Sequence, residues 1–231
     1  MRLNKYISES GLCSRREADA WIEHGRVTVN GAPAVLGTQV NAGDVVRVGQ
    51  RIVRPRQEHV YLALHKPAGI TCTTERQVPG NIIDFIGHPR RIFPIGRLDK
   101  DSEGLILLTS NGDIVNEILR AENRHEKEYV VTVDQPVTPA FLAGMAAGVP
   151  ILGTRTLPCT LRQTGRQQFR IILTQGLNRQ IRRMCAAFGY QVRRLVRVRI
   201  IGLTLGGLAA GQWRELTPAE CQKLLPRRQQ W

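Results

Sequence analysis

The chain has 231 residues, of which 42% are apolar, enough for one large or two modest packed domains. Its net charge of +14 points to a polyanionic partner, with nucleic acid favoured over a membrane surface and ribosomal RNA as the first candidate. The five cysteines include no Cys-x-x-Cys pair, and no signal segment or unbroken membrane-length apolar run is present, so we expect a cytoplasmic protein with reduced cysteines and no zinc site.

The first fifty residues are predicted to form a small unit of two helices and short strands. A capping box formed by Ser14 and Glu17 starts the second helix. A strand is expected at residues 27–29, followed by the hairpin turn signal Asn30-Gly31, and another strand at residues 44–48. The apolar faces of the two helices comprise Leu3, Tyr6, Ile7, Ala18, Trp21 and Ile22.

Residues 50–59 are polar, basic and proline-bearing, which is typical of a linker. We therefore predict domains at residues 1–49 and 60–231. The stretch RLNKYISESGLCSRREADAWIEHGRVTVNG, residues 2–31, resembles the S4 RNA-binding domain. Off its apolar faces lies a cluster of basic residues, which we expect to dock a folded RNA backbone. The cluster consists of Arg2, Lys5, Arg15, Arg16 and Arg26.

The remainder is predicted to be a mixed α/β unit with one larger sheet. Strands are expected at residues 60–64, 104–109, 128–133, 169–174 and 192–201. Asn178 is the expected N-cap of a helix whose apolar residues recur at i, i+3, i+4 and i+7. A final short helix is predicted to begin at Thr217-Pro218. The apolar stripe of the first of these helices comprises Ile181, Met184, Cys185 and Phe188.

One long segment, residues 135–214, contains twelve arginines and no Asp or Glu. Such a stretch repels itself unless something neutralises it. We interpret it as a phosphate-binding surface, in preference to a basic surface without function. Arginine also suits bidentate phosphate contacts and stacking on bases.

The stretch PIGRLDKDSEGLILLT, residues 94–109, places Asp99 on a loop between two buried apolar segments. On local pattern alone, Asp99 could simply cap a turn. GRLD with GLILLT, however, resembles the second motif of the pseudouridine synthases, which convert uridine in RNA to pseudouridine. The resemblance implies that Asp99 is the catalytic nucleophile, with Arg97 and Leu98 in the pocket.

Three further stretches match that family in order. HKPAG resembles the first motif and implies that Lys66 shapes the site, while KEY implies that Tyr129 stacks on the flipped uracil. LTQGLNRQIRR, residues 173–183, resembles the third motif. It implies that Ile181 packs under the nucleotide and that Arg182 pairs with Asp99. No cofactor or metal is implied.

The third motif departs from the commoner G-R-x-H-Q form, because Leu177 and Arg179 replace its arginine and histidine. We therefore assign neither position a part in the reaction. Arg179, with Arg183, is instead predicted to bind RNA.

Over nearly the whole chain the sequence most resembles the RluF type within the RsuA-like group of S4-containing pseudouridine synthases. This implies an α+β fold, with a small S4 (αL-like) domain and a larger domain built on a mixed, mainly antiparallel sheet flanked by helices. The expected substrate is 23S ribosomal RNA of the large subunit, with transfer RNA as a second RNA, and the expected state is a monomer.

Two other classes remain open from the sequence. A non-catalytic S4 factor would explain the charge but not the motifs. A nucleic-acid glycosidase would pair Asp99 with Asp101 or Glu103 across a sugar, about 5–9 Å apart.

Overall fold

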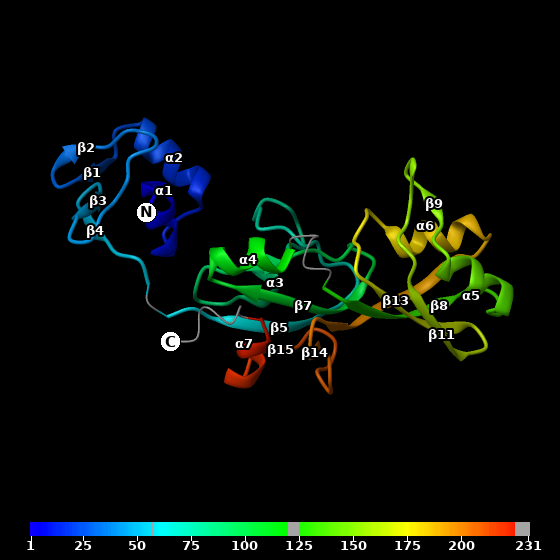
Figure 1. Ribbon diagram of the computed structural model, residues 1–231. Coiled ribbons are helices and arrows are strands. Elements are labelled where there is room, and N and C mark those ends of the chain that lie inside the picture. The colour runs from blue at the N-terminus through cyan, green and yellow to red at the C-terminus, as the bar shows by residue number, and fades with distance from the viewer. Residues whose placement is uncertain (57, 120–124, 225–231) are drawn as a thin grey trace. The chain divides into compact units, whose positions relative to one another are not determined.

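The computed structural model describes residues 1–56, 58–119 and 125–224. The chain forms two compact units (Figure 1). The first contains residues 1–60 with the short pieces 88–92 and 110–112, and the second contains the rest. Within the described residues, no helix is long and apolar enough to cross a membrane.

The first unit packs two helices on a small antiparallel sheet with strand order β2-β1-β3-β4. The capping box is confirmed, because the Glu17 amide donates to the Ser14 hydroxyl and the Ser14 amide donates to the Glu17 carboxylate. Asn30 and Gly31 both have positive φ, as the predicted hairpin turn requires. The elements are α1 (Leu3–Glu9), α2 (Arg15–Glu23), β1 (Val27–Val29), β2 (Ala32–Pro33), β3 (Val46–Val48) and β4 (Arg51–Val53).

Strand β4 pairs with β3 and so extends this sheet into residues that the sequence suggested as linker. The core below the sheet is apolar, with Leu3 and Ile7 of α1 packed against Ala18 and Ile22 of α2. The helices and the sheet of this unit therefore share one small core.

The second unit is built on a sheet with strand order β11-β12-β8-β13-β7-β5-β15. The pair β7–β13 is parallel, whereas the other neighbours along this order are antiparallel. This confirms the α+β class with a mixed, mainly antiparallel sheet. The strands are β5 (Tyr61–Lys66), β7 (Glu103–Thr109), β8 (Lys127–Val133), β11 (Thr160–Gly165), β12 (Gln168–Leu173), β13 (Val192–Ile200) and β15 (Trp213–Glu215).

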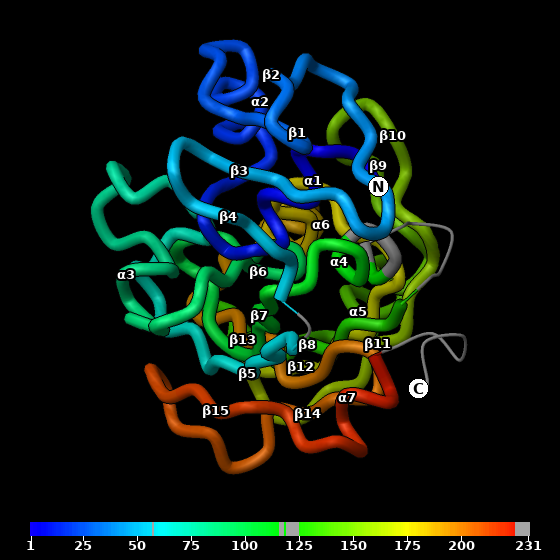
Figure 2. Tube along the Cα trace, turned by 90° about the vertical axis from the view of Figure 1, so that its left-hand side faces the viewer, coloured from blue at the N-terminus to red at the C-terminus, as the bar shows by residue number. Residues whose placement is uncertain are grey.

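Helices and short strands gather at both ends of this sheet (Figure 1). Helices α3 and α4 lie toward β5, and α5 and α6 lie toward β8 and β11. The C-terminal segment, coloured orange to red, runs along one side of the unit with β14, β15 and α7 (Figure 2). The remaining elements are α3 (Ile82–Ile86), β6 (Phe93–Ile95), α4 (Gly112–Leu119), α5 (Pro139–Ala146), β9 (Pro150–Ile151), β10 (Thr154–Arg155), α6 (Gln180–Ala187), β14 (Leu203–Thr204) and α7 (Pro218–Leu224).

One face of β8, β12 and β13 buries α5 and α6. Phe141 of α5 and Met184 of α6 are packed with Val131 of β8 and Phe169 of β12, each of them nearly inaccessible to solvent. The apolar spacing predicted for α6 is confirmed for its buried residues, but Phe188 is 39% exposed and follows the helix as its C-cap.

The predicted N-cap of α6 is wrong. The helix begins at Gln180, and Arg179 is the N-cap, with φ 49° and ψ 35°, in the left-handed region, and with no side-chain cap bond. Asn178 lies one residue too early; its side-chain oxygen instead accepts from the Arg183 guanidinium. The final helix is as predicted, with the Glu220 amide donating to the Thr217 hydroxyl.

Strand β7 lies in the middle of the sheet and is buried from Gly104 to Thr109. Its neighbour β13 approaches Gly104 so closely that a Cβ there would lie 2.2 Å from the Arg197 carbonyl oxygen. Gly104 also has φ +108°, which side chains rarely allow. Only glycine therefore permits this parallel contact.

We expect Gly104→Ala to destabilise the second unit by about 2–5 kcal/mol, because overpacking adds to backbone strain. Gly87→Ala is the matched control: its φ is +63° but nothing lies within 4 Å of the added Cβ. The control should lose only about 1–2 kcal/mol. Urea unfolding followed by circular dichroism measures both, and equal losses would contradict the close approach at Gly104.

Candidate active site

An open cleft of about 910 Å³ lies in the second unit. Its walls come from the loop after β6, from β8, from the segment between β12 and α6, and from β13. Several residues singled out in the sequence line it together: Arg97, Leu98, Asp99, Tyr129, Arg179 and Ile181. Residues of the second motif, the KEY stretch and the third motif, far apart in the chain, thus meet at one place.

The loop that carries Asp99 is closed at its neck by strand pairing. Ile95 of β6 pairs with Leu107 of β7, so the chain leaves and re-enters the sheet beside itself. Within the loop, the Ser102 amide donates to the Asp99 carbonyl at 3.0 Å. Arg97 is exposed at the cleft, Leu98 is buried and Asp99 is half-buried. The loop therefore presents a carboxylate from a fixed turn.

Lys66 holds this loop from within the protein. Its side chain is fully buried, and Nζ donates to the carbonyl oxygens of Pro67, Ile70 and Lys100 at 2.8, 2.9 and 3.2 Å. Burial lowers the pKa of this lysine, and the nearby acidic groups oppose that effect. Lys66 thus ties the first motif to the loop of the second, rather than standing in the cleft wall.

Arg182 does not form the predicted pair with Asp99. Its Nε lies 3.4 Å from Asp101 Oδ2, and Nη2 donates to the Asp101 carbonyl at 3.0 Å and to the Ser102 hydroxyl at 3.4 Å. No ion pair joins Arg182 to Asp99 among the residues that the structure describes. The guanidinium reaches the part of the loop two residues beyond the expected partner, where it binds backbone as well as carboxylate.

Asp101 is also held by Arg179. The two arginine nitrogens Nη1 and Nη2 donate to Oδ1 and Oδ2 at 3.0 and 2.9 Å. The hydrogen bonds from Arg179, followed by the charge of Arg182, lower the pKa of the Asp101 carboxyl group. Glu103 is held in the same way by Arg194, at 2.9 and 2.8 Å, and its pKa is lowered by that bond.

Asp99 therefore differs from the two acidic residues that follow it. Over the described parts of the chain, its carboxylate makes no ion pair, whereas Asp101 and Glu103 each have a bidentate arginine. The loop leaves one carboxylate free, and that residue lines the cleft.

The part of the lining formed by β8 and β13 is cationic and aromatic. Tyr129 of β8 is half-buried in the lining and lies directly across from Arg197 of β13 in the strand register. Lys127, on the same face of β8, has its pKa lowered by burial and by the charge of Arg197. Ile181 is 5% exposed and completes an apolar patch in the lining.

Arg197 is a site residue that the sequence analysis missed. It is only 3% exposed, and its Nε donates to the Leu105 carbonyl at 2.7 Å while Nη1 donates to the Arg97 carbonyl at 3.4 Å. It thus links both ends of the loop. The signal was present, because Leu195 and Arg197 occupy the inward positions of an alternating strand.

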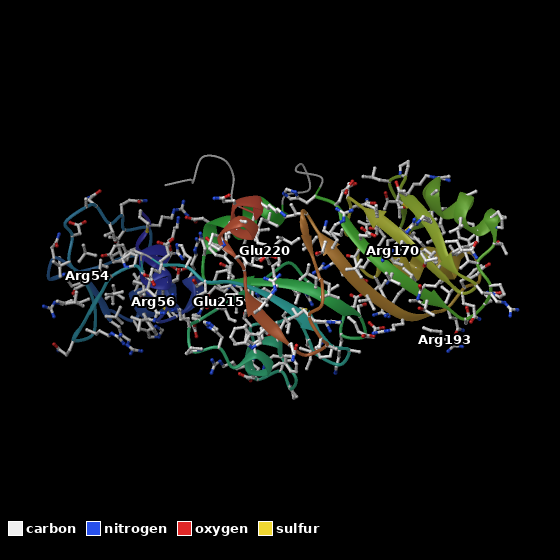
Figure 3. The ribbon with its side chains drawn as sticks, turned by 90° about the horizontal axis from the view of Figure 1, so that it is seen from below. Arg54, Arg56, Arg170, Arg193, Glu215 and Glu220 are labelled. Carbon is white, nitrogen blue, oxygen red and sulfur yellow. The ribbon has the colours of Figure 1, made fainter. Side chains whose placement is uncertain are left out.

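Half of the arginines in the arginine-rich segment, residues 135–214, are paired with carboxylates within the described structure, whereas the sequence suggested an unpaired basic surface. Counting only partners that the structure describes, six of its twelve arginines form ion pairs with carboxylates from outside residues 135–214. Figure 3 labels Arg170 of this set toward one end of the sheet, and toward the other end Glu220 of α7, the partner of Arg214. Arg183, predicted to bind RNA, is exposed and donates to Asn178.

In the first unit, most of the predicted basic cluster is accessible. Arg2, Arg15, Arg16 and Arg26 are exposed, and the Arg26 guanidinium lies 5.5 Å from the centre of the Trp21 ring. Lys5 is half-buried and lies 3.5 Å from Glu9.

Comparisons with known proteins identify the family of the chain. The sequence profile described as RNA pseudouridylate synthase matches residues 60–187, and that of the S4 domain matches residues 1–46. The chain is 60% identical over 221 residues to the "Dual-specificity RNA pseudouridine synthase RluF" of Salmonella typhi, covering 95% of this chain and 76% of the relative. It is 36% identical over 232 residues to the "Ribosomal large subunit pseudouridine synthase B" of Bacillus subtilis, covering 96% and 95%.

Among solved structures, one described as "Crystal structure of pseudouridylate synthase" superposes with a TM-score of 0.72 at 30% identity, covering 97% of this chain and all of that one. The resemblance to the RluF type is thereby confirmed.

We expect Lys66→Met to cost about 2–4 kcal/mol of unfolding free energy, because it leaves buried carbonyl oxygens without a donor. Methionine keeps the length and apolar stem of the side chain, so packing changes little. Thermal unfolding measures the loss. The carbonyl groups of the loop would also lose their common tether, and hydrogen exchange of the Gly69 amide, which donates to Lys100 at 2.7 Å, should accelerate. Unchanged stability and exchange would contradict the assigned bonds.

Proposed function

The chain belongs to the RNA pseudouridylate synthase family and is an enzyme that isomerises uridine to pseudouridine in RNA, and from this premise we propose that Asp99 is its nucleophile. The observation that supports this most is the free carboxylate. Asp101 and Glu103 are bound by arginines, and Asp99 alone of these three remains unpaired within the described structure while lining the cleft.

The reaction requires such a group. The bond between N1 of uracil and C1′ of the ribose breaks, the detached uracil turns, and C5 bonds to C1′. The proton leaves C5 and N1 gains one, so the nucleotide keeps its mass. A carboxylate can attack the nucleotide and later leave, which divides one difficult exchange into two steps.

The uridine must leave its stack to reach the cleft. Tyr129 and Ile181 both line the cleft, which supports a role for Tyr129 in stacking on an extruded base and for Ile181 as an apolar surface under the nucleotide. Arg97 is exposed beside Asp99 and is suited to a backbone phosphate of the flipped nucleotide. Arg182 supports the reaction by holding the loop.

The glycosidase alternative requires a second carboxyl group to act as general acid, and neither Asp101 nor Glu103 is suited to that role. A general acid needs a raised pKa, whereas the pKa values of Asp101 and Glu103 are both lowered by their arginine partners. The non-catalytic alternative is excluded by the family to which the chain belongs.

We assign the RNA substrate to the large ribosomal subunit. The name of the Bacillus relative supports this assignment, and the RNA-binding S4 domain is suited to a folded RNA. The name of the Salmonella relative, dual-specificity, favours a second RNA class as well, for which transfer RNA is our candidate.

Asp99→Asn should reduce turnover by roughly 10⁴-fold or more, because an amide cannot act as the nucleophile. Forming a bond at C5 expels the hydrogen there, so tritium release from 5-tritiated uridine in RNA measures the reaction. RNA binding and the melting temperature should change little. Asp134→Asn is the control and should remain active. The Asp134 carboxylate lies outside the cleft and accepts a hydrogen bond from the Gln191 amide. Tritium release by Asp99→Asn at the parent rate would overturn the assignment.

Arg15→Glu/Arg16→Glu in the full-length chain should weaken RNA binding without lowering turnover at saturating RNA. Both residues are exposed in the first turn of α2, where acidic residues are favourable, so the unit should stay folded. The slope of log affinity against log salt should fall by roughly one for each phosphate that the variant no longer binds. Arg47→Glu/Arg51→Glu on β3 and β4 makes the same change in net charge. Equal effects of the two pairs would show that only net charge matters, against a docking face on α2.

A further inference from the structure

Arg179 is the residue at which the third motif departs from the form common in the family, and its backbone is strained. A non-glycine residue at φ 49°, ψ 35° is disfavoured by about 1–2 kcal/mol. Its side chain makes no cap bond for α6, so helix formation does not account for the conformation. Strain of this kind persists where surrounding contacts impose it, often at functional sites.

The contact that Arg179 makes is to the nucleophile loop. The two terminal nitrogens each donate to one oxygen of Asp101. This bidentate geometry gives an arginine–carboxylate pair its directional strength. The side chains are 42% and 48% exposed, so the pair adds little to overall stability. Its consequence is local, because it fixes the start of α6 against the loop that carries Asp99.

Asp101 also joins Arg179 to Arg182. The same Oδ2 that accepts from Arg179 lies 3.4 Å from Arg182 Nε. The hydrogen bonds to Asp101 raise the pKa of Arg179, and the charges of Asp101 and then Asp99 add to this effect. Without Arg179, the charge of Asp101 would be less neutralised beside Asp99, and Arg182 alone would hold the loop from α6.

We propose that Arg179 and Asp101 form a positioning pair for the nucleophile: the pair holds the loop in register with α6 and keeps the arginines occupied by Asp101, so that the Asp99 carboxylate stays free. This inference rests on the proposed role of Asp99. Arg179 then affects kcat by positioning the Asp99 loop, whereas the sequence alone suggested that it contacts an RNA phosphate.

Arg179→Gly removes the guanidinium and also relieves the backbone strain, since glycine adopts the left-handed conformation without steric cost. Loss of the ion pair should therefore lower the rate without lowering stability. The melting temperature should therefore stay equal or rise, while kcat falls by roughly 10–100-fold, the effect of a misplaced reacting group. KM should change by less than about 3-fold, because phosphate contacts are spread over many residues. Arg179→Lys, which keeps a charge but cannot bind both oxygens, should recover part of kcat.

Asp101→Asn should lower kcat to a similar extent, and the double variant Arg179→Gly/Asp101→Asn should be no slower than the slower single variant, since residues that act as a unit are not additive. Arg214→Ala is the matched control. It breaks another bidentate pair, with Glu220 at 2.7 and 2.6 Å, outside the cleft lining, and its kcat should equal that of the parent.

Tritium release under single and multiple turnover measures all these variants beside Asp99→Asn. A rise in KM with unchanged kcat and a shallower salt slope for Arg179→Gly would overturn the proposal and make Arg179 a phosphate contact. Additive effects in the double variant would also overturn it. If Asp99→Asn is inactive while these variants keep the parent kcat, the positioning pair alone is wrong; if Asp99→Asn is active, the nucleophile assignment is wrong.

Discussion

The site depends on keeping one carboxylate free beside two others. Asp99, Asp101 and Glu103 lie within five residues, and a cation near one carboxylate attracts its neighbours as well. The protein meets this constraint by giving Asp101 and Glu103 their own arginines with two hydrogen bonds each. The loop backbone is bound separately, by Lys66 and Arg197. Within the described residues, Asp99 is thus left without an ion pair, because other cations bind the neighbouring carboxylates and the loop backbone.

The order of strands in the sheet makes this arrangement possible. Loop and strand are continuous, since Glu103 and Gly104 begin β7, and these two residues form the parallel contact with β13. Because side chains alternate along β13, Arg194 and Arg197 can reach opposite sides of that contact. Arg194 binds the Glu103 carboxylate, and Arg197 binds the carbonyl oxygens of Leu105 in β7 and Arg97 in the loop. Gly104, which has no side chain, brings the strands near enough for both. Stability of the sheet and placement of the Asp99 loop therefore rest on the same contact.

Much of this fold follows from patterns that are local in the sequence. The capping box at Ser14, the turn at Asn30-Gly31 and the five predicted strands of the second unit depend on neighbours within a few residues, and the structure contains them. Helix α5 escaped prediction because it carries Gly144 in its interior, which ordinarily weakens a helix. The structure supplies the reason: a Cβ at Gly144 would lie 2.5 Å from the Phe188 ring, so glycine makes room for that ring.

The charge contacts of the site could not be derived in this way. Motif resemblance predicted that Arg182 lies beside the loop that carries Asp99, but the order of residues does not say which of two aspartates, two positions apart, a long side chain will reach. Nor does it say that an acid-free segment will draw its counter-charges from elsewhere in the chain. The arginines that bind Asp101, Glu103 and Glu128 have their charges neutralised within the second unit. Other arginines of the segment are exposed and make no ion pair among the described residues: Arg155, Arg162, Arg166, Arg183 and Arg193. Among the described residues, the segment therefore divides most of its arginines between those neutralised by carboxylates of the second unit and those exposed without an ion pair.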